Sequence, residues 1–245
     1  HGVFAALGSR ANARVVVDLS GDHRSDDSWV YGVTEFARAD LSDADRVANP
    51  GCYPTAALLA LIPFFRESLI TGPVIVDALS GVSGAGRTTA EDLGFSEMHA
   101  NMRAYGSTTH RHVAEMERHL ARFGTVDARV SFTPHLVPMA RGLLVTVRAA
   151  LAEDVDDSHA LEVLHEAYRD EPFVRVTDQW PQTKWVTGSN AAVVSARVDA
   201  SIGMLVASAA IGNLGKGAAG QAIQNANLML GLDETSGLSA DGMWP

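Results

Sequence analysis

The sequence predicts a mixed α/β and α+β fold, in which the last helix returns to a partial doubly wound unit at the start of the chain. Three observations predict it. Strand and helix patterns alternate at the start, several β-branched runs follow one another through the middle, and a helix pattern rich in small residues closes the chain. We therefore expect three segments, namely the doubly wound remnant at 1–51, an α+β unit at 52–212 and the returning helix at 213–245.

The opening third is expected to contain a buried strand and one long helix. Residues 14–24 (RVVVDLSGDHR) carry a β-branched run before an acidic turn, which is typical of a buried parallel strand. Residues 25–46 are rich in Asp and Ser and are expected to form a surface loop with a single helical turn. Pro54 suits the first helical position, and the apolar run after it predicts a helix over 54–70.

The rest of the chain is expected to combine strands with three further helices. Helices are predicted at 109–124, 156–171 and 215–232. Strands are predicted at 73–81, 128–139, 142–151, 173–176, 191–199 and 204–212. In the first of these helices Val113, Met116 and Leu120 recur at helical spacing, and Ser158 is the expected N-cap of the second. The run of strands favours a mixed or antiparallel sheet.

The composition excludes several classes of function. With 47% hydrophobic and 20% charged residues, the chain of 245 residues is ordinary for a globular protein. A net charge of −10 argues against a broad nucleic-acid surface, and the absence of a long apolar run argues against a membrane span. A single cysteine cannot form an internal disulfide, so we expect a cytoplasmic protein. Because the chain opens at His1 without an initiator Met, it is expected to be a fragment.

The only cysteine, Cys52, lies in the stretch NPGCYPT over residues 49–55. Pro50 and Gly51 favour a non-helical approach and Pro54 favours a helix start, so Cys52 is expected at a helix N-terminus. Unpaired backbone N–H groups and the helix dipole stabilise a thiolate there, and the same groups can hold a developing oxyanion. The alternative is a small buried apolar residue at a helix start.

Three further stretches offer what such a thiolate needs. His110 and His112 can supply an imidazole as acid–base partner, and Arg111 between them can hold a carboxylate or phosphate. The glycines of SGVSGAGR (80–87) allow close backbone approach to a cofactor, and NLGKGAAGQA (213–222) suits a nearby phosphate or nicotinamide. The alternatives are a solvated helical turn, a connecting loop and a helix packed closely through small residues.

Together these stretches resemble the N-acetyl-γ-glutamyl-phosphate reductase family, a relative of aspartate-semialdehyde dehydrogenase. The most specific match is NPGCYPTAALLAL. In the family's order the chain also holds DLSGDHR, YGVTE, SGVSGAGR, HRHVAE, SFTPHLVPMARGLL, GSNAA and NLGKGAAGQAIQNANLMLGL. The sequence departs at Gly21, His23, Thr34 and Ala114, where the family usually has Ala, Phe, Pro and Pro. None of these removes a catalytic group, so the departures concern local geometry.

The resemblance implies a fold and a reaction. The fold is a partial Rossmann-type NADP-binding domain (1–51, joined by 213–245) plus a glyceraldehyde-3-phosphate-dehydrogenase-like catalytic and oligomerisation domain (52–212), assembled as a homo-oligomer. The reaction is the NADPH-dependent reduction of N-acetyl-γ-glutamyl phosphate to the semialdehyde and phosphate, a step of arginine biosynthesis. The family's opening βαβ unit, with its glycine-rich fingerprint, is expected to precede His1, so this chain alone is expected to bind NADPH poorly.

The resemblance also assigns residues by position. Cys52 is the nucleophile that forms a thioester, and His112 is its acid–base partner, with His110 as the fallback. Substrate-binding residues are His110, Arg111 and Arg141. Cofactor-binding residues are Ser83, Gly84, Asn213, Lys216 and Gly217. No metal site is predicted, and the choice between NADP and NAD stays open because the residues that read the ribose are expected before His1.

Two kinds of alternative remain open. Within the same class, the chain can be a reductase of a carrier-bound acyl phosphate in lysine biosynthesis, or an aspartate-semialdehyde dehydrogenase. The net charge of −10 weighs against a surface for an acidic carrier protein. In a different class, it can be a truncated, non-catalytic partner of a full-length chain. The DNA upstream of the His1 codon distinguishes these, because an in-frame glycine-rich fingerprint indicates a fragment of an enzyme.

Overall fold

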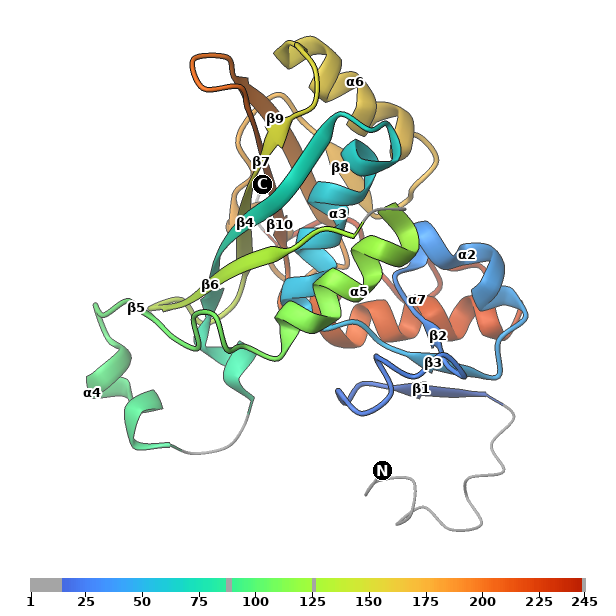
Figure 1. The fold of residues 1–245 in the computed structure, drawn as a ribbon. Helices are drawn as coiled ribbons and strands as arrows, with labels where there is room; N and C mark the ends of the chain where they lie inside the picture. Colours follow the sequence, from blue (N-terminus) through green and yellow to red (C-terminus); the bar gives the residue numbers. More distant parts are fainter. Residues whose placement is uncertain (1–14, 87–89, 125–126, 244–245) are drawn as a thin grey trace.

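The computed structural model describes residues 15–86, 90–124 and 127–243. Their strands form one sheet of seven strands and one of three, and helices lie between the two sheets (Figure 1). Within these residues, no helix is both long and apolar enough to cross a bilayer.

The three-stranded sheet is parallel and lies near the start of the chain. It contains β1 (Val16–Asp18), β2 (Val30–Tyr31) and β3 (Arg46–Ala48), in the order β1-β3-β2. The closing helix α7 (Gly220–Met229) packs against β1 and against α2 (Thr34–Ser42), so the end of the chain does return to its beginning.

Helix α2 corrects the prediction of a surface loop with a single helical turn over 25–46. The helix has nine residues and buries Thr34, Ala37 and Leu41, which recur every three or four positions. These three buried residues form a narrow helical face, and the surrounding Asp and Ser residues make it hard to recognise in the sequence. Packing of that face against α7 supplies the stability that local propensity lacks.

The seven-stranded sheet is mixed. Its strands are β4 (Ile70–Gly81), β5 (Arg103–Ala104), β6 (Val130–Val137), β7 (Leu143–Leu151), β8 (Val174–Val176), β9 (Ala192–Asp199) and β10 (Met204–Ile211). The order across the sheet is β5-β6-β4-β7-β10-β9-β8. The pairs β4–β6 and β8–β9 are parallel, whereas the other neighbours are antiparallel.

Three of the remaining helices match the predicted regions with shifted ends. They are α3 (Cys52–Arg66), α5 (His112–Gly124) and α6 (Asp157–Ala167). The short helix α4 (Phe95–Met98) was not predicted. Helix α6 is capped by Asp156, whose carboxylate accepts the backbone N–H of His159 at 2.8 Å, and not by Ser158 as the sequence predicts. The predicted helix over 215–232 is divided: residues Gly215–Ala219 form a π-helical turn, here called the π-turn, before α7 begins.

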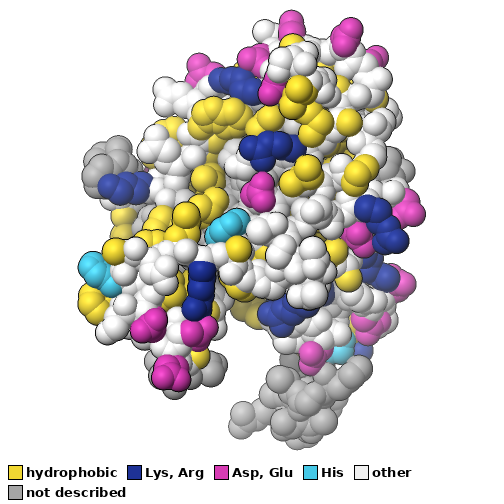
Figure 2. Space-filling view, turned by 60° about the vertical axis from the view of Figure 1, so that its left-hand side comes forward, with side chains coloured by type: hydrophobic (Ala, Val, Ile, Leu, Met, Phe, Trp, Pro, Cys, Tyr) yellow, Lys and Arg dark blue, Asp and Glu magenta, His cyan; other side chains and the backbone are white. Residues whose placement is uncertain are grey.

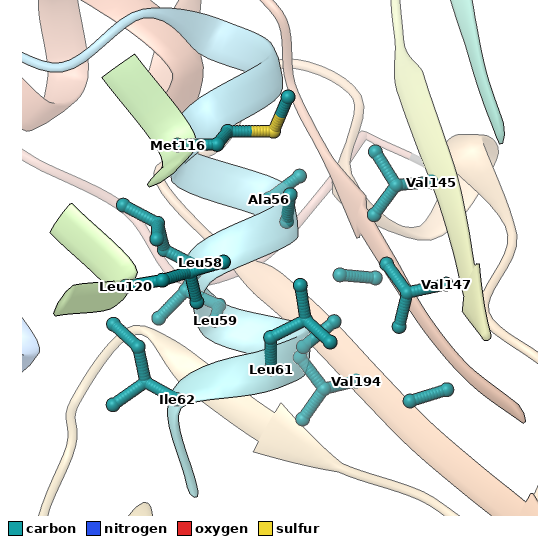
Figure 3. Close-up of a cluster of buried hydrophobic side chains, with 14 of the residues drawn as sticks. Ala56, Leu58, Leu59, Leu61, Ile62, Met116, Leu120, Val145, Val147 and Val194 are labelled. Atoms are coloured by element: carbon teal, nitrogen blue, oxygen red, sulfur yellow. The ribbon is translucent and has the colours of Figure 1, made fainter. Parts of the chain in front are cut away.

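Helix α3 is the centre of the core. It is apolar on all sides and lies between α5 and the large sheet, which is the expected setting for such a helix (Figure 3). Met116 and Leu120 of α5 pack on one side of it, and Val145, Val147 and Val194 of the sheet lie on the other. Truncating a leucine in a core of this kind typically costs about 2–5 kcal/mol. The first residue of α3, Cys52, is therefore fixed by the best-packed element of the chain.

Among the residues that the structure describes, no helix covers the face of the large sheet opposite to α3 (Figure 1). In β4, Val74 and Val76 are buried on the helical side, whereas Ile75 between them is 43% exposed. Ile75 pairs across the sheet with Arg148, which in turn pairs with Val206. Hydrophobic side chains gather on the surface in Figure 2, interrupted by a few charged groups. A large apolar surface of this kind marks an interaction site in many proteins.

Candidate functional site

One pocket gathers most of the predicted site residues. Its volume is about 490 Å³, and it lies where the starts of α3 and α5, the loop after β4 and the π-turn meet. Eight of the ten predicted residues line it: Cys52, Ser83, Gly84, His110, Arg111, His112, Asn213 and Gly217. Residues from segments more than a hundred positions apart in the sequence thus share one cavity.

Cys52 is the first residue of α3, two positions earlier than the sequence predicts. Gly51 is the N-cap, with an extended backbone, and its carbonyl accepts the N–H of Thr55 at 2.9 Å. Burial raises the pKa of the Cys52 thiol to about 11. The backbone N–H of Tyr53 and the charge of Arg24 act in the opposite direction but do not outweigh the burial. The thiol is therefore protonated at neutral pH, although it lies at a helix N-terminus.

Gly51 allows His112 to approach the start of α3. A Cβ atom at position 51 would lie 2.6 Å from Nε2 of His112 and 2.8 Å from Nη1 of Arg24. Since φ at Gly51 is −69°, the glycine is required for this close approach and not for its backbone conformation. Any larger residue here displaces the imidazole from the helix that carries Cys52.

His112 is the first residue of α5 and is only 5% exposed. Neither of its ring nitrogens has a hydrogen-bond partner among the described residues. Burial, together with the nearby His110 and Arg24, lowers the pKa of His112 to about 2. The imidazole is therefore neutral at ordinary pH, and its ring nitrogens are available for a hydrogen bond to a group that enters the pocket.

His110 has a different environment. Its Nδ1 accepts the backbone N–H of His112 at 3.2 Å, so it acts as a cap at the start of α5. Its ring lies 4.6 Å from the ring of His112, measured between centroids, and burial lowers its pKa. One ring nitrogen of His110 thus has a structural task that neither nitrogen of His112 has.

A buried ion pair that the sequence did not reveal supports the starts of both α3 and α5. Glu115 of α5 accepts the N–H of Gly51 and the hydroxyl of Tyr31, each at 2.8 Å, through Oε1. Its Oε2 accepts Nη1 of Arg24 at 3.2 Å, and Arg24 also donates to the carbonyl of Asn49. Both charged side chains are less than 10% exposed. Glu115 lies one turn after His112 in HRHVAE, and that spacing is the signal that could have revealed it.

Polar groups and glycines form the side of the pocket next to the loop after β4. Asn213 joins three elements, because its Nδ2 donates to Oγ of Ser83 at 2.9 Å and its Oδ1 accepts the N–H of Gly142 at 3.0 Å. A Cβ atom at Gly84 would lie 2.7 Å from Oγ of Ser80. A Cβ atom at Gly217 would lie 2.8 Å from Cβ of Cys52. These short distances show that the backbone at both glycines packs closely against its neighbours, and at Gly217 that neighbour is Cys52.

Two predicted residues lie elsewhere. Arg141 lines a second cavity of about 310 Å³, which adjoins the first at Asn213 and Leu214. Lys216 is completely buried and donates to Glu35, so its ammonium group does not reach the pocket.

The pocket instead contains a cation that the sequence did not indicate. Arg103 of β5 lines it and forms an exposed ion pair with Asp92. Tyr53 and Tyr105 also line it, with their hydroxyl oxygens 2.9 Å apart.

Comparisons with known proteins agree with this geometry. Residues 52–213 match the family described as semialdehyde dehydrogenase, dimerisation domain. N-acetyl-gamma-glutamyl-phosphate reductase from Bradyrhizobium sp. (strain BTAi1) is 44% identical, over 99% of this chain and 78% of that protein. The enzyme of the same name from Pelotomaculum thermopropionicum is 43% identical, over 100% of this chain and 77% of that protein.

The solved structures show the fold. Aspartate semialdehyde dehydrogenase II from Vibrio cholerae superposes with a TM-score of 0.74 at 20% identity, covering 94% of this chain and 76% of that one. The large mixed sheet and the small parallel sheet are thus those of a semialdehyde dehydrogenase fold. The two reductases are more than 40% identical to this chain, and the match covers more than three quarters of their length. The chain therefore belongs to the N-acetyl-γ-glutamyl-phosphate reductase family.

Proposed function

We propose that this chain carries the catalytic machinery for reducing N-acetyl-γ-glutamyl phosphate to its semialdehyde through a thioester on Cys52. The observation that carries the proposal is the pairing of Cys52, at a helix N-terminus, with the buried imidazole of His112. Its two nitrogens have no hydrogen-bond partner among the described residues, and its Nε2 lies 3.9 Å from Oε2 of Glu115. Cys52 and His112 line the same pocket. The family supports the substrate, since the relatives' names identify it.

The first step is acyl transfer to sulfur. His112 accepts the thiol proton, and Sγ of Cys52 attacks the acyl carbon. The carbonyl oxygen gains negative charge, which the unpaired backbone N–H groups at the start of α3 stabilise. When the tetrahedral species collapses, the bond between carbon and the phosphate oxygen breaks, phosphate leaves and a thioester remains. Arg24 lies beside this site and its charge favours the thiolate.

Two arginines are placed to hold the anionic groups of the substrate. Arg24 is already occupied by Glu115, whereas Arg111 is exposed at the pocket and Arg103 is paired only with Asp92. The Arg103–Asp92 pair is exposed, so it is worth little and a substrate carboxylate can replace Asp92. We assign the carboxylate and phosphate of the substrate to Arg103 and Arg111, and we place Arg141 outside this pocket.

We assign the nicotinamide ring to the part of the pocket next to Cys52. Ser83, Gly84, Asn213 and Gly217 line the same pocket, and a side chain at either glycine would collide with its neighbours. NADPH, when bound, supplies the hydride that reduces the thioester carbon. Release of the aldehyde then breaks the C–S bond, and the protonated His112 returns its proton to Sγ.

Two further assignments belong to the proposal. The three-stranded sheet and α7 form the part of a Rossmann-type, NADP-binding unit within 1–51 and 213–245, and 52–212 is the catalytic and oligomerisation domain. The open face of the large sheet is where two copies join, because the matched family describes a dimerisation domain and this face carries exposed Ile75.

The acyl-transfer step can be tested without any cofactor. Mixed with N-acetyl-γ-glutamyl phosphate, the chain is expected to release one phosphate per Cys52 in a burst, which a phosphate-binding sensor measures. Cys52→Ser should abolish the burst, and His112→Asn should slow it about 10²–10⁴-fold, the usual contribution of a general base. His110→Asn is the matched control and should slow it less. A full burst in Cys52→Ser contradicts the thioester, and a larger loss in His110→Asn means that His110 is the base.

A further inference from the structure

Two motifs that the pocket chemistry leaves unused meet in the interior. They are YGVTE at 31–35 and the lysine of NLGKGAAGQA. Nζ of Lys216 donates to Oε1 of Glu35, and to Oε1 of Gln224 at 2.7 Å. The two charged side chains are 0% and 1% exposed. Burying a charged lysine costs desolvation free energy, and pairing it with a carboxylate offsets this cost only in part. A buried pair at this position therefore suggests a function other than stability.

Lys216 belongs to the π-turn. The N–H of Gly217 bonds to the carbonyl of Gly212 at 2.9 Å, and the N–H of Ala219 bonds to that of Leu214 at 3.0 Å, so both bonds span five residues. Turns of this type are rare and occur frequently at functional sites. Since a single wide turn has little stability of its own, contacts made by its side chains must hold it in place.

The π-turn lies directly on the cysteine. A Cβ atom at Gly217 would be 2.8 Å from Cβ of Cys52, so the backbone of the turn touches the first residue of α3. The only other side-chain bond to the turn given by the described residues comes from Asn49, whose Nδ2 donates to the carbonyl of Ala218 at 3.1 Å. Any movement of the turn therefore changes how far Cys52 is covered.

We propose that the Lys216–Glu35 pair is a positioning device for Cys52, which clamps the π-turn onto the start of α3 and keeps the thiol covered and directed into the pocket. Its importance rests on the proposed role of Cys52 as nucleophile. The shelter of the Cys52 thiol by the pair can be tested whether or not Cys52 takes part in a reaction. Glu35 is a suitable anchor because it lies in the first turn of α2, which α7 holds in place.

The pair acts by contact and not by its charge. The charges that shift the Cys52 thiol are those of Arg24 and Glu115, and Lys216 is not among them. The other titratable groups near the thiol are His110, His112, Tyr53, Tyr105, Arg103 and Arg111, all of which line the same pocket. Burial is the main reason for the high pKa of Cys52. Loosening the π-turn should therefore make the thiol more reactive towards small electrophiles while it impairs the positioned chemistry.

The test measures alkylation of Cys52 by iodoacetamide as a function of pH, on the 245-residue chain without substrate or cofactor. Glu35→Gln keeps an acceptor for Lys216, and the double variant Lys216→Met with Glu35→Gln removes both charges together. Two controls are matched to them. Lys184→Met changes the only other lysine, which is exposed, and Arg38→Met removes the ion pairs of α2 to Glu171 and Glu234 without touching the π-turn.

In the double variant, alkylation at about pH 8 should be at least about tenfold faster, since each unit by which the thiol pKa falls raises the thiolate fraction about tenfold. The midpoint of the pH profile should fall, and the phosphate burst should slow. The controls should retain the parent profile. A positioning role predicts both faster alkylation of Cys52 and a slower phosphate burst in the same folded variant.

Three outcomes would overturn the proposal that the pair shelters Cys52. An unchanged profile in the folded double variant means that the pair does not shelter Cys52. An equal shift in Arg38→Met means that general loosening is the cause. If the double variant lacks a cooperative melting transition, the alkylation profile of Glu35→Gln is compared with the parent profile instead. If both variants fail to fold while the controls fold, the pair only stabilises the chain. A full phosphate burst in Cys52→Ser would instead contradict the proposed function and leave the shelter of the thiol intact.

Discussion

Replacing Gly51 with alanine adds one methyl group at the point where the two catalytic helices meet. That methyl would lie 2.6 Å from Nε2 of His112 and 2.8 Å from Nη1 of Arg24. To reach an ordinary contact of about 3.5 Å, the imidazole must move by about 0.9 Å. A displacement of that size can slow a reaction about 10²-fold, and overpacking of this kind costs about 1–3 kcal/mol of stability.

The assay for Gly51→Ala is the phosphate burst, with urea unfolding for stability. The burst should slow about 10²-fold, while the substrate concentration at half-maximal rate changes little, because Arg103 and Arg111 are left in place. Gly94→Ala is the control, since Gly94 is exposed and the added methyl would lie 3.3 Å from its nearest neighbour, the carbonyl of Glu91. A normal burst from a folded Gly51→Ala would refute the claim that the imidazole must lie against Gly51.

Three further predictions follow from the same site. The rate of alkylation of Cys52 by iodoacetamide should rise about tenfold per pH unit and level off only near about pH 11, and a plateau near the ordinary thiol pKa of about 8.5 would contradict burial as the dominant effect. The folded-state pKa values of His112 and His119 are about 2 and about 4, below the unfolded value of about 6.5, so the unfolded chain binds more protons and stability is lost as pH falls below about 6.5. At pH 5 each histidine should cost about 2 kcal/mol in urea unfolding, and His119→Gln should remove about half of the loss. Arg103→Met should raise the substrate concentration at half-maximal burst rate about tenfold with little change in the maximal rate, whereas Arg129→Met, at an 80% exposed position, should have no effect.

The start of α3 is the part of the site that the sequence predicts best. Proline and glycine restrict the backbone locally, so NPGCYPT is enough to place a cysteine at a helix N-terminus. The state of that cysteine is not local. The helix N-terminus favours a thiolate, but burial by segments distant in sequence raises the pKa to about 11. Sequence therefore predicts the position of the cysteine, and tertiary packing sets the protonation of its thiol.

Charged residues were the least predictable. Arg24 and Glu115 are 91 positions apart. The spacing of Glu115 from His112 is a local signal for the glutamate, but no local pattern indicates that Arg24 is its partner. Lys216 misleads for the same reason. A cation in a glycine-rich helix start is typical of a phosphate site, yet its partner is Glu35, 181 positions away. Helix α2 was missed because its buried face has three residues among many polar ones.

The separation of Glu35 and Lys216 has a consequence for the order in which the protein is made. At about 5–20 residues per second, a ribosome needs roughly 10–40 s to synthesise the 181 residues between them. Helix α3 is synthesised early in that interval, before the turn that packs on its cysteine exists. The nascent thiol should then have an ordinary pKa and react with oxidants and electrophiles that the finished protein resists. Pulse alkylation of ribosome-bound chains stalled before and after residue 216 would measure this interval, and equal protection at both stalls would show that the cysteine is covered earlier.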